Sequence, residues 1–312
     1  MAGVSDFVAA QKVNRRNTLV LLVVLTGFAA LFGYLIGLVL EAQATDRIEV
    51  MSPLGIGAAG LLAAVSVGWS MISLAFGNRM VLSMADAKQI EKADAPQLFN
   101  VVEEMSIASG TPMPKVHIME TDALNAFATG TSTSNGSIVA TRGLLDTLDR
   151  EELQGVVAHE MAHIANLDTR YMTIVGVTVG LIALVADLAL RWLRFRGSGN
   201  RKSGAGILLI VLLVVAIFAP IAAKAVQMAV SRQREYLADA TSVRFTRNPA
   251  GLVSALAKLE AAAKPFPGVS RATQHLFIVN PMQRVTEKTS ALMATHPEIG
   301  DRIARLKNLA VA

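Results

Sequence analysis

The stretch His159-Glu160-Met161-Ala162-His163 has the residue types and the spacing of a hydrolytic metal site. Residues four apart on an α-helix lie on one face, about one turn apart, so both imidazoles could bind the same metal ion. The glutamate that follows the first histidine could reach a water molecule at that ion and take its proton. Two nitrogen ligands, a carboxylate base and an open coordination position are what a zinc peptidase needs.

The alternative is a helix that carries the two histidines and the glutamate on a solvated face. The residues around the motif argue against this alternative. They are mostly apolar and predict a buried helix: Gly155, Val156, Val157, Ala158, Met161, Ala162, Ile164 and Ala165. Buried polar side chains need partners, and a metal ion is the simplest partner that serves both imidazoles. The motif therefore favours a metal site.

A catalytic zinc site needs a third protein ligand, and because the chain contains no cysteine the choices are His, Asp and Glu. In gluzincin peptidases this ligand is a glutamate on a later helix, often with an acid four residues further on. Glu235 and Asp239 have that spacing, which puts them on one helical face. By this pattern Glu235 binds zinc, and Asp239 accepts a hydrogen bond from a ligand imidazole and fixes its tautomer. The alternative is that both acids pair with arginines on a solvated helix: Arg232, Arg234 and Arg244.

The composition is that of a membrane protein rather than of an ordinary soluble domain. Of the 312 residues, 53% are hydrophobic and only 17% are charged. The lack of cysteine excludes disulfide bonds and thiolate metal sites. The net charge is +5, but no long basic run indicates a nucleic-acid groove. We therefore expect a lipid bilayer around part of the chain and no nucleic-acid partner.

Two long apolar segments near the N-terminus predict a transmembrane hairpin. Thr18–Leu40 runs 23 residues without a charge, enough to span the ~30 Å hydrocarbon core with some tilt. Leu54–Phe76 follows after 13 residues. The alternative is a signal peptide cleaved near Ala42-Gln43-Ala44, but the apolar region of a signal peptide is about 7–15 residues long. The first segment exceeds that length, which favours the hairpin.

The remaining sequence predicts a soluble α+β domain. Asp149, followed three residues later by Glu152, is a helix-capping pattern and opens the helix that carries the metal motif. The other expected elements are helices over Pro96–Met105, from Asn248-Pro249 onward and over Pro297–Leu309, and strands at Lys115–Met119, Leu124–Gly130 and Ser137–Thr141.

The apolar segments divide the chain into four parts. These are an N-terminal transmembrane hairpin (1–76), a first part of the catalytic domain (77–171), a second hydrophobic hairpin (172–230) and a second part of the catalytic domain (231–312). The expected fold class is α+β and mostly helical, in an integral membrane protein with up to four transmembrane helices. Whether segments 172–190 and 207–230 fully cross the bilayer stays open at this level.

Basic residues near membrane spans mark the cytoplasmic side. They gather around the N-terminus and the soluble parts, whereas the loop Glu41–Pro53 has one basic residue, Arg47, against three acids. This bias places the active site in the cytoplasm. The basic stretch 191–206 disagrees, because a complete second hairpin would export it. Either the first hairpin dominates the orientation or the second hairpin does not fully cross.

Five segments together make the chain resemble the HtpX-type membrane zinc metalloproteases, which are related to the CAAX prenyl proteases. The segments are Leu124–Gly130, His159–His163, Ser231–Ala240, His275–Pro281 and Thr295-His296-Pro297. The resemblance covers most of the chain and implies a zincin-like catalytic domain. It also implies a bacterial cytoplasmic (inner) membrane location, a part in the stress response, and proteolysis of misfolded or damaged membrane proteins.

Three further site residues are expected by analogy with this family. A histidine near the position of His296 contacts the oxyanion in related enzymes; the alternative is a helix-capping or surface histidine. Asn125 and Ala126 are expected on a strand edge that pairs with the substrate backbone. The alternative for these two residues is an ordinary core strand.

The sequence therefore predicts an integral membrane zinc endopeptidase that acts on proteins or peptides. His159, His163 and Glu235 are the expected Zn²⁺ ligands, and Glu160 is the expected general base and acid. The rival function is a metal-stabilised membrane scaffold or adaptor without turnover. A purely structural zinc site would be closed by a fourth protein ligand, and none is evident near the motif.

Overall fold

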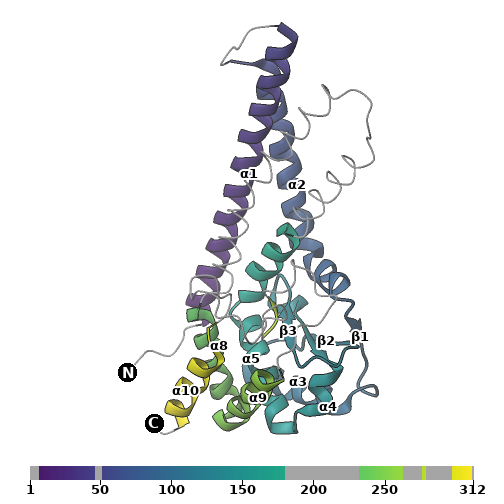
Figure 1. Ribbon diagram of the computed structural model, residues 1–312, viewed down its shortest axis with the longest axis vertical. Helices are drawn as coiled ribbons and strands as arrows, with labels where there is room; N and C mark the ends of the chain where they lie inside the picture. Colours follow the sequence, from purple (N-terminus) through teal and green to yellow (C-terminus); the bar gives the residue numbers. More distant parts are fainter. Residues whose placement is uncertain (1–6, 46–50, 180–231, 263–275, 279–296, 311–312) are drawn as a thin grey trace.

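The computed structural model describes residues 7–45, 51–179, 232–262, 276–278 and 297–310. A long helical hairpin rises from a body in which helices surround a small sheet (Figure 1). The hairpin consists of α1 (Phe7–Thr45) and α2 (Pro53–Met84), which lie side by side. His296, the basic stretch 191–206 and most of the predicted second hairpin lie outside the described residues.

Both predicted apolar segments near the N-terminus are helical, and their backbones approach closely. A Cβ atom added to Gly37 of α1 would collide with the Leu54 carbonyl of α2, and one at Gly33 would collide with the Ala58 carbonyl. Small residues at such positions allow close helix packing where the solvent is lipid. The Ser52 hydroxyl caps the start of α2 by accepting a hydrogen bond from the backbone N–H of Gly55.

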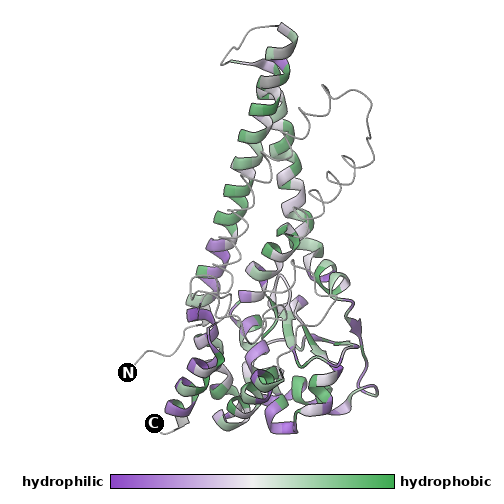
Figure 2. Ribbon diagram, viewed as in Figure 1, coloured by the Kyte–Doolittle hydropathy of each residue, from purple (hydrophilic) through white to green (hydrophobic). Residues whose placement is uncertain are grey.

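By length and composition, two described helical stretches are long and apolar enough to cross a membrane: Ala9–Ala42 and Pro53–Met84. Figure 2 shows apolar residues over most of α1 and α2, and polar residues where α1 meets the body. The helix α2 continues past Phe76, where the sequence placed the end of the first hairpin, and reaches Met84. The hairpin and the body are therefore joined by continuous helix.

The sheet has four strands in the order β1-β2-β4-β3. The strands are β1 (Lys88–Gln89), β2 (Lys115–Met119), β3 (Ala126–Thr129) and β4 (Ser137–Thr141). β2 and β4 are parallel and have the predicted bounds, whereas β1 and β3 pair with them antiparallel. β3 begins at Ala126, two residues later than predicted, and ends before Gly130, whose φ of 145° turns the chain away. The sheet order leaves β3 as an edge strand.

The central helix of the body is α5 (Arg150–Ala165), which carries the metal motif. It begins with the predicted capping box: the Asp149 carboxylate accepts hydrogen bonds from the N–H groups of Glu151 and Glu152, and the Glu152 carboxylate accepts one from the Asp149 N–H. Nearly all of α5 is buried, as the apolar flanks predict. The helix therefore presents His159, Glu160 and His163 to the interior and not to solvent.

Four elements pack around α5 and hold it in place. They are the edge strand β3 and the helices α3 (Pro96–Ser109), α8 (Arg232–Thr246) and α9 (Pro249–Ala261). At Gly155 an added Cβ atom would lie 2.6 Å from the Leu252 nitrogen, so only glycine permits the close approach of α9. The helix α9 begins at the predicted start, and Asn248 caps it by accepting hydrogen bonds from two backbone N–H groups.

The last described helix, α10 (Ile299–Ala310), packs on α8 and α9. It starts two residues after the predicted Pro297. The described structure is thus an α+β, mostly helical fold, which confirms the expected fold class. In that fold α8, α9 and α10 come from the C-terminal part of the chain and cover the helix that carries the metal motif.

Candidate active site

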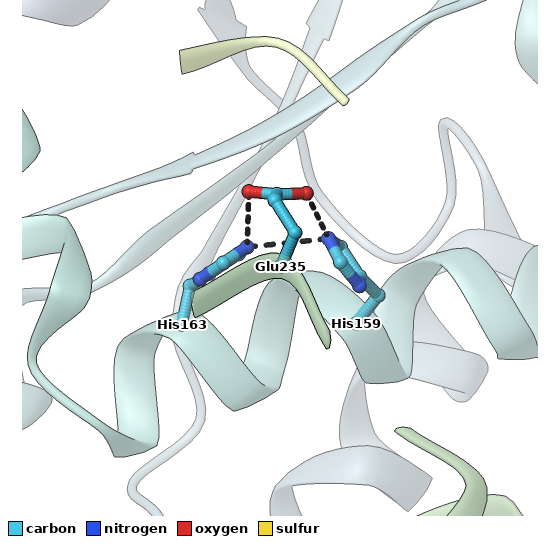
Figure 3. Close-up of side chains that lie close together, drawn as sticks. All are labelled: His159, His163 and Glu235. Atoms are coloured by element: carbon cyan, nitrogen blue, oxygen red, sulfur yellow. Dashed lines mark hydrogen bonds and ion pairs between the residues drawn. The ribbon is translucent and has the colours of Figure 1, made fainter. Parts of the chain in front are cut away.

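Three side chains from two helices converge on one buried point. His159 and His163 extend from α5, and Glu235 extends from the first turn of α8 (Figure 3). The two Nε2 atoms lie 3.2 Å apart. The Glu235 oxygens lie 3.6 Å from His159 Nε2 and 3.7 Å from His163 Nε2. The exposed fractions of these residues are 1%, 4% and 3%, so the three groups meet out of contact with bulk water.

The cluster has the size of a zinc site. Tetrahedral bonds of about 2.0–2.1 Å to nitrogen and oxygen place any two ligand atoms about 3.3 Å apart. The two Nε2 atoms are 3.2 Å apart, close to this value, and each of them has one Glu235 oxygen within 3.7 Å. With one ligand atom from each residue, the three atoms lie within 4.8 Å of one another. Within the described part of the chain, no other group of histidine and acidic side chains meets in a way that could hold a metal ion. The donor atoms present therefore fit one cation.

The outward nitrogen of each imidazole is bound by an aspartate. His159 Nδ1 lies 3.0 Å from Asp239 Oδ1, and His163 Nδ1 lies 3.0 Å from Asp168 Oδ2. A carboxylate accepts, so each Nδ1 donates and each Nε2 faces the interior. Two such nitrogens 3.2 Å apart, beside a carboxylate, favour a positive charge between them, which either a proton or a metal ion can supply. This arrangement is a second reason why the site suits a cation.

The ion-pair partners raise the pKa of His159. Burial and the charge of Arg302 lower it, but the hydrogen bonds to Asp239 and Glu235 outweigh them and raise the pKa to about 9. An imidazole with this pKa is protonated on both ring nitrogens at neutral pH and carries a positive charge. A metal ion that binds between the two imidazoles must therefore displace one of these protons.

Ser242 helps to position α8, and with it Glu235 and Asp239, against the motif helix. Its hydroxyl donates a 2.9 Å hydrogen bond to the Gly155 carbonyl of α5. Ala238, between the two acids, is fully buried in the same interface. The spacing of four residues puts both acids on the α5 side of α8, as the sequence predicted for a ligand and its neighbour. The structure thus brings Asp239 to His159.

Arg302, which sequence analysis did not connect with the site, binds the Asp239 carboxylate. It lies on α10 and is 1% exposed. Its Nε donates to Asp239 Oδ2 at 2.9 Å, and its NH2 donates to Asp239 Oδ1 at 2.6 Å. NH1 lies 3.4 Å from Glu235 Oε2. Burial raises the pKa of Asp239, but Arg302 and the His159 hydrogen bond lower it more, so this carboxyl stays ionised.

Glu160, the expected base, is also buried, with 2% of its surface exposed. Burial raises the pKa of its carboxyl. The charges of His159 and Arg302 lower this pKa, but by less than burial raises it. A carboxylate with a raised pKa is a stronger base than one in water, which suits a group that takes and returns a proton.

Asn125 and Ala126 lie at the start of the edge strand β3, as the sequence predicted. The Asn125 N–H donates to the Thr141 hydroxyl, which ties this end of the strand to β4. The Ala126 carbonyl accepts a 3.0 Å hydrogen bond from the N–H of Ile278. Phe277 packs edge-on against Phe127, with ring centroids 4.8 Å apart. The segment 276–278 therefore occupies part of the strand edge that was assigned to substrate.

Comparisons with known proteins agree with this description. The family model for peptidase family M48 matches residues 92–310. The protease HtpX homolog of Tropheryma whipplei (strain Twist) is 44% identical over 245 residues, which cover 78% of this chain and 83% of that protein. The homolog of Streptococcus gordonii is 37% identical over 304 residues, or 95% of this chain and 97% of that one.

Among solved structures, the crystal structure of S. mikatae Ste24p matches with a TM-score of 0.48 and 17% sequence identity. The match covers 79% of this chain and 57% of that one.

An apolar helical hairpin joined to a body with a buried His–His–Glu cluster defines the class: a membrane metallopeptidase. More specifically, the chain belongs to peptidase family M48, because the family model spans most of its length and the two HtpX homologs named above are aligned over 78% and 95% of it. The resemblance to the HtpX-type proteases is confirmed. A metal-stabilised scaffold without turnover is not supported.

Proposed function

We propose that this chain is a zinc endopeptidase in which His159, His163 and Glu235 hold the ion. The observation that carries the proposal is the convergence of the three ligand atoms within 4.8 Å of one another in a buried site. Zinc suits the donor set because it accepts imidazole and carboxylate in a tetrahedral arrangement and leaves one position for water or substrate. Asp239 positions His159 by holding its Nδ1.

A bound zinc ion would polarise the substrate carbonyl and lower the pKa of the attacking water. Glu160 performs the proton transfers: its carboxylate takes a proton from that water and later delivers it to the amine that leaves. The raised pKa of the Glu160 carboxyl fits a group that is protonated and deprotonated in each cycle. Because Glu160 is buried, bulk water does not exchange protons with it in competition with the two transfers.

We propose that the substrate backbone adds to the edge strand β3 at Asn125 and Ala126. The edge position of β3 and its contact with α5 support this. Because Ile278 holds the Ala126 carbonyl, a substrate strand that uses this carbonyl must displace Ile278. His296, in the family motif ahead of α10, is the proposed contact for the oxyanion.

The proposed substrates are misfolded or damaged proteins of the bacterial cytoplasmic membrane, cut on its cytoplasmic side as part of a stress response. The apolar hairpin α1–α2 and the HtpX naming of the relatives support this. We also propose that 77–171 and 231–312 form one catalytic domain between the hairpins 1–76 and 172–230. The packing of α8 and α9 on α5 supports that division.

The test is proteolysis of a fluorescently labelled, partly unfolded membrane protein by the full chain in detergent. We expect cleavage that stops with a chelator and returns with stoichiometric zinc. A labelled soluble peptide provides the comparison for substrate class. Cleavage that persists in excess chelator would contradict the zinc assignment, and cleavage of the soluble peptide alone would contradict the membrane-protein substrate.

A further inference from the structure

The first turns of α1 dock on the turn that follows the motif helix. Gln11 Nε2 donates a 2.7 Å hydrogen bond to the Ala165 carbonyl at the end of α5. Asn14 Nδ2 donates to the Asn166 carbonyl at 3.0 Å and to Asp168 Oδ1 at 2.7 Å. All three acceptors are oxygens, so the amide nitrogens must face them. Asn14 is 4% exposed, so its bonds are shielded from water.

Asp168 connects this docking contact to the metal site. One carboxylate oxygen, Oδ1, accepts from Asn14, and the other, Oδ2, is bound to His163 Nδ1 at 3.0 Å. Arg234 Nε lies 3.6 Å from Oδ1, beyond the distance of a hydrogen bond. The Asn14 amide is therefore the short contact that fixes the plane of this carboxylate, and the carboxylate fixes the imidazole.

The backbone of the turn also depends on α1. The helix α5 ends at Ala165 with Asn166 as its C-cap, and Leu167 follows with a φ of 60°, a left-handed conformation that is strained for leucine. This turn is what returns Asp168 to the side of His163. Gln11 and Asn14 hold the two carbonyls that precede Leu167, so α1 supports the turn from outside.

We propose that Asn14 is a positioning residue for the metal site: it orients Asp168 and, through Asp168, the imidazole of His163. The inference rests on the proposed function in that His163 is a ligand. Because α1 is also a candidate membrane span, the orientation of one ligand depends directly on how the N-terminal membrane helix is seated. The hydrogen-bonded support of His163 is complete only when α1 is docked.

The chain offers matched variants that separate positioning from docking. Asn14→Ala removes both the docking bond to Asn166 and the contact with Asp168. Asn14→Leu removes the same bonds but keeps the volume of the side chain. Gln11→Ala removes a docking bond of similar length, although a less buried one, without touching Asp168. Asn17→Ala changes the same residue type one turn further along α1.

The measurement is zinc affinity of each full-length variant in detergent, by competition with a chromophoric chelator. Loss of a partner that orients a ligand histidine costs about 10–100-fold in metal affinity. Asn14 contacts Asp168 and not the histidine itself, so its effect should be smaller. Asn14→Ala and Asn14→Leu are therefore expected to weaken zinc binding about tenfold, at the lower end of that range. Gln11→Ala and Asn17→Ala are expected to bind as the wild type does.

A double variant provides the decisive readout. If Asn14 acts through Asp168, then adding Asn14→Ala to Asp168→Asn weakens zinc binding no further than Asp168→Asn alone. Additive losses would overturn the inference, and so would equal affinity in Asn14→Ala and Gln11→Ala. A wild-type chain that binds no zinc would overturn the proposed function and this inference together, whereas wild-type binding with unchanged Asn14 variants would overturn this inference alone.

Discussion

Asp239 Oδ1 lies 3.0 Å from His159 Nδ1, while the same carboxylate accepts two hydrogen bonds from the guanidinium of Arg302. The imidazole is thus fixed by an aspartate that is itself fixed by an arginine. The arginine comes from α10, so the last described helix supports one of the proposed ligand histidines. His163 has the corresponding aspartate, Asp168, which is contacted from the N-terminal helix.

Replacing Glu235 should weaken zinc binding more than replacing Asp239. Glu235→Gln removes a charged ligand, and we expect a sharp loss of affinity. Asp239→Asn removes only the acceptor that orients His159, and we expect a loss of about 10–100-fold. Chelator competition measures both, with Glu260→Gln on the exposed face of α9 as the control. Wild-type affinity and activity in Glu235→Gln would refute the ligand assignment.

Arg302 should matter for stability as well as for the site. Arg302→Met leaves the buried Asp239 carboxylate without its charged partner, which typically costs about 3–5 kcal/mol of unfolding free energy. Lys307→Met, on the exposed face of the same helix, is expected to cost little. Thermal unfolding in detergent compares the two variants. Similar melting temperatures for both would show that the Arg302–Asp239 pair does not stabilise the fold.

Zinc affinity should rise with pH. The His159 pKa of about 9 means that the metal-free site holds a proton at neutral pH. Zinc must displace this proton, so the apparent affinity falls as the pH falls and rises about tenfold per unit from pH ~7 up to ~9, where it levels off. Calorimetry in buffers of different ionisation enthalpy should detect the released proton. A pH-independent affinity over this range would be inconsistent with the protonated site.

The orientation of the membrane hairpin can be tested with single cysteines, because the chain has none of its own. Thr45, at the exposed end of α1, and Ser134, in an exposed loop of the body, are suitable positions. The excess of basic residues on the body's side predicts that a cysteine at Thr45 reacts with an impermeant reagent outside the cell. A cysteine at Ser134 should react only after the membrane is opened. The reverse pattern would place the body outside.

Local patterns in the sequence were sufficient to predict much of the fold. The Asp149–Glu152 capping box, the alternation of Lys115–Met119 and the cap at Asn248 each depend on residues close in sequence. The same is true of the relation between His159 and His163, because one helical turn determines it. Glu235 is distant, and it was predicted from the gluzincin pattern of a later glutamate with an acid four residues on, together with the chemistry of zinc.

The residues that orient the two histidines, directly or through an aspartate, could not be predicted from local patterns. Asp168 reaches His163 only because Leu167 adopts a left-handed turn, which the sequence does not indicate for a leucine. Asn14 acts across more than 150 residues. Arg302 did leave a signal: it precedes the buried Leu306 by four residues and so lies on the same face of an amphipathic helix. A charge on an apolar face points to a buried partner.

The most direct test of a catalytic zinc site compares Glu160→Gln with the wild type for zinc content and peptide cleavage in the same preparations. The variant keeps the size of the side chain and all three ligands but removes the base. We predict about one zinc ion per chain in both proteins and cleavage by the wild type alone. Undiminished cleavage by Glu160→Gln, with zinc bound, would contradict the account.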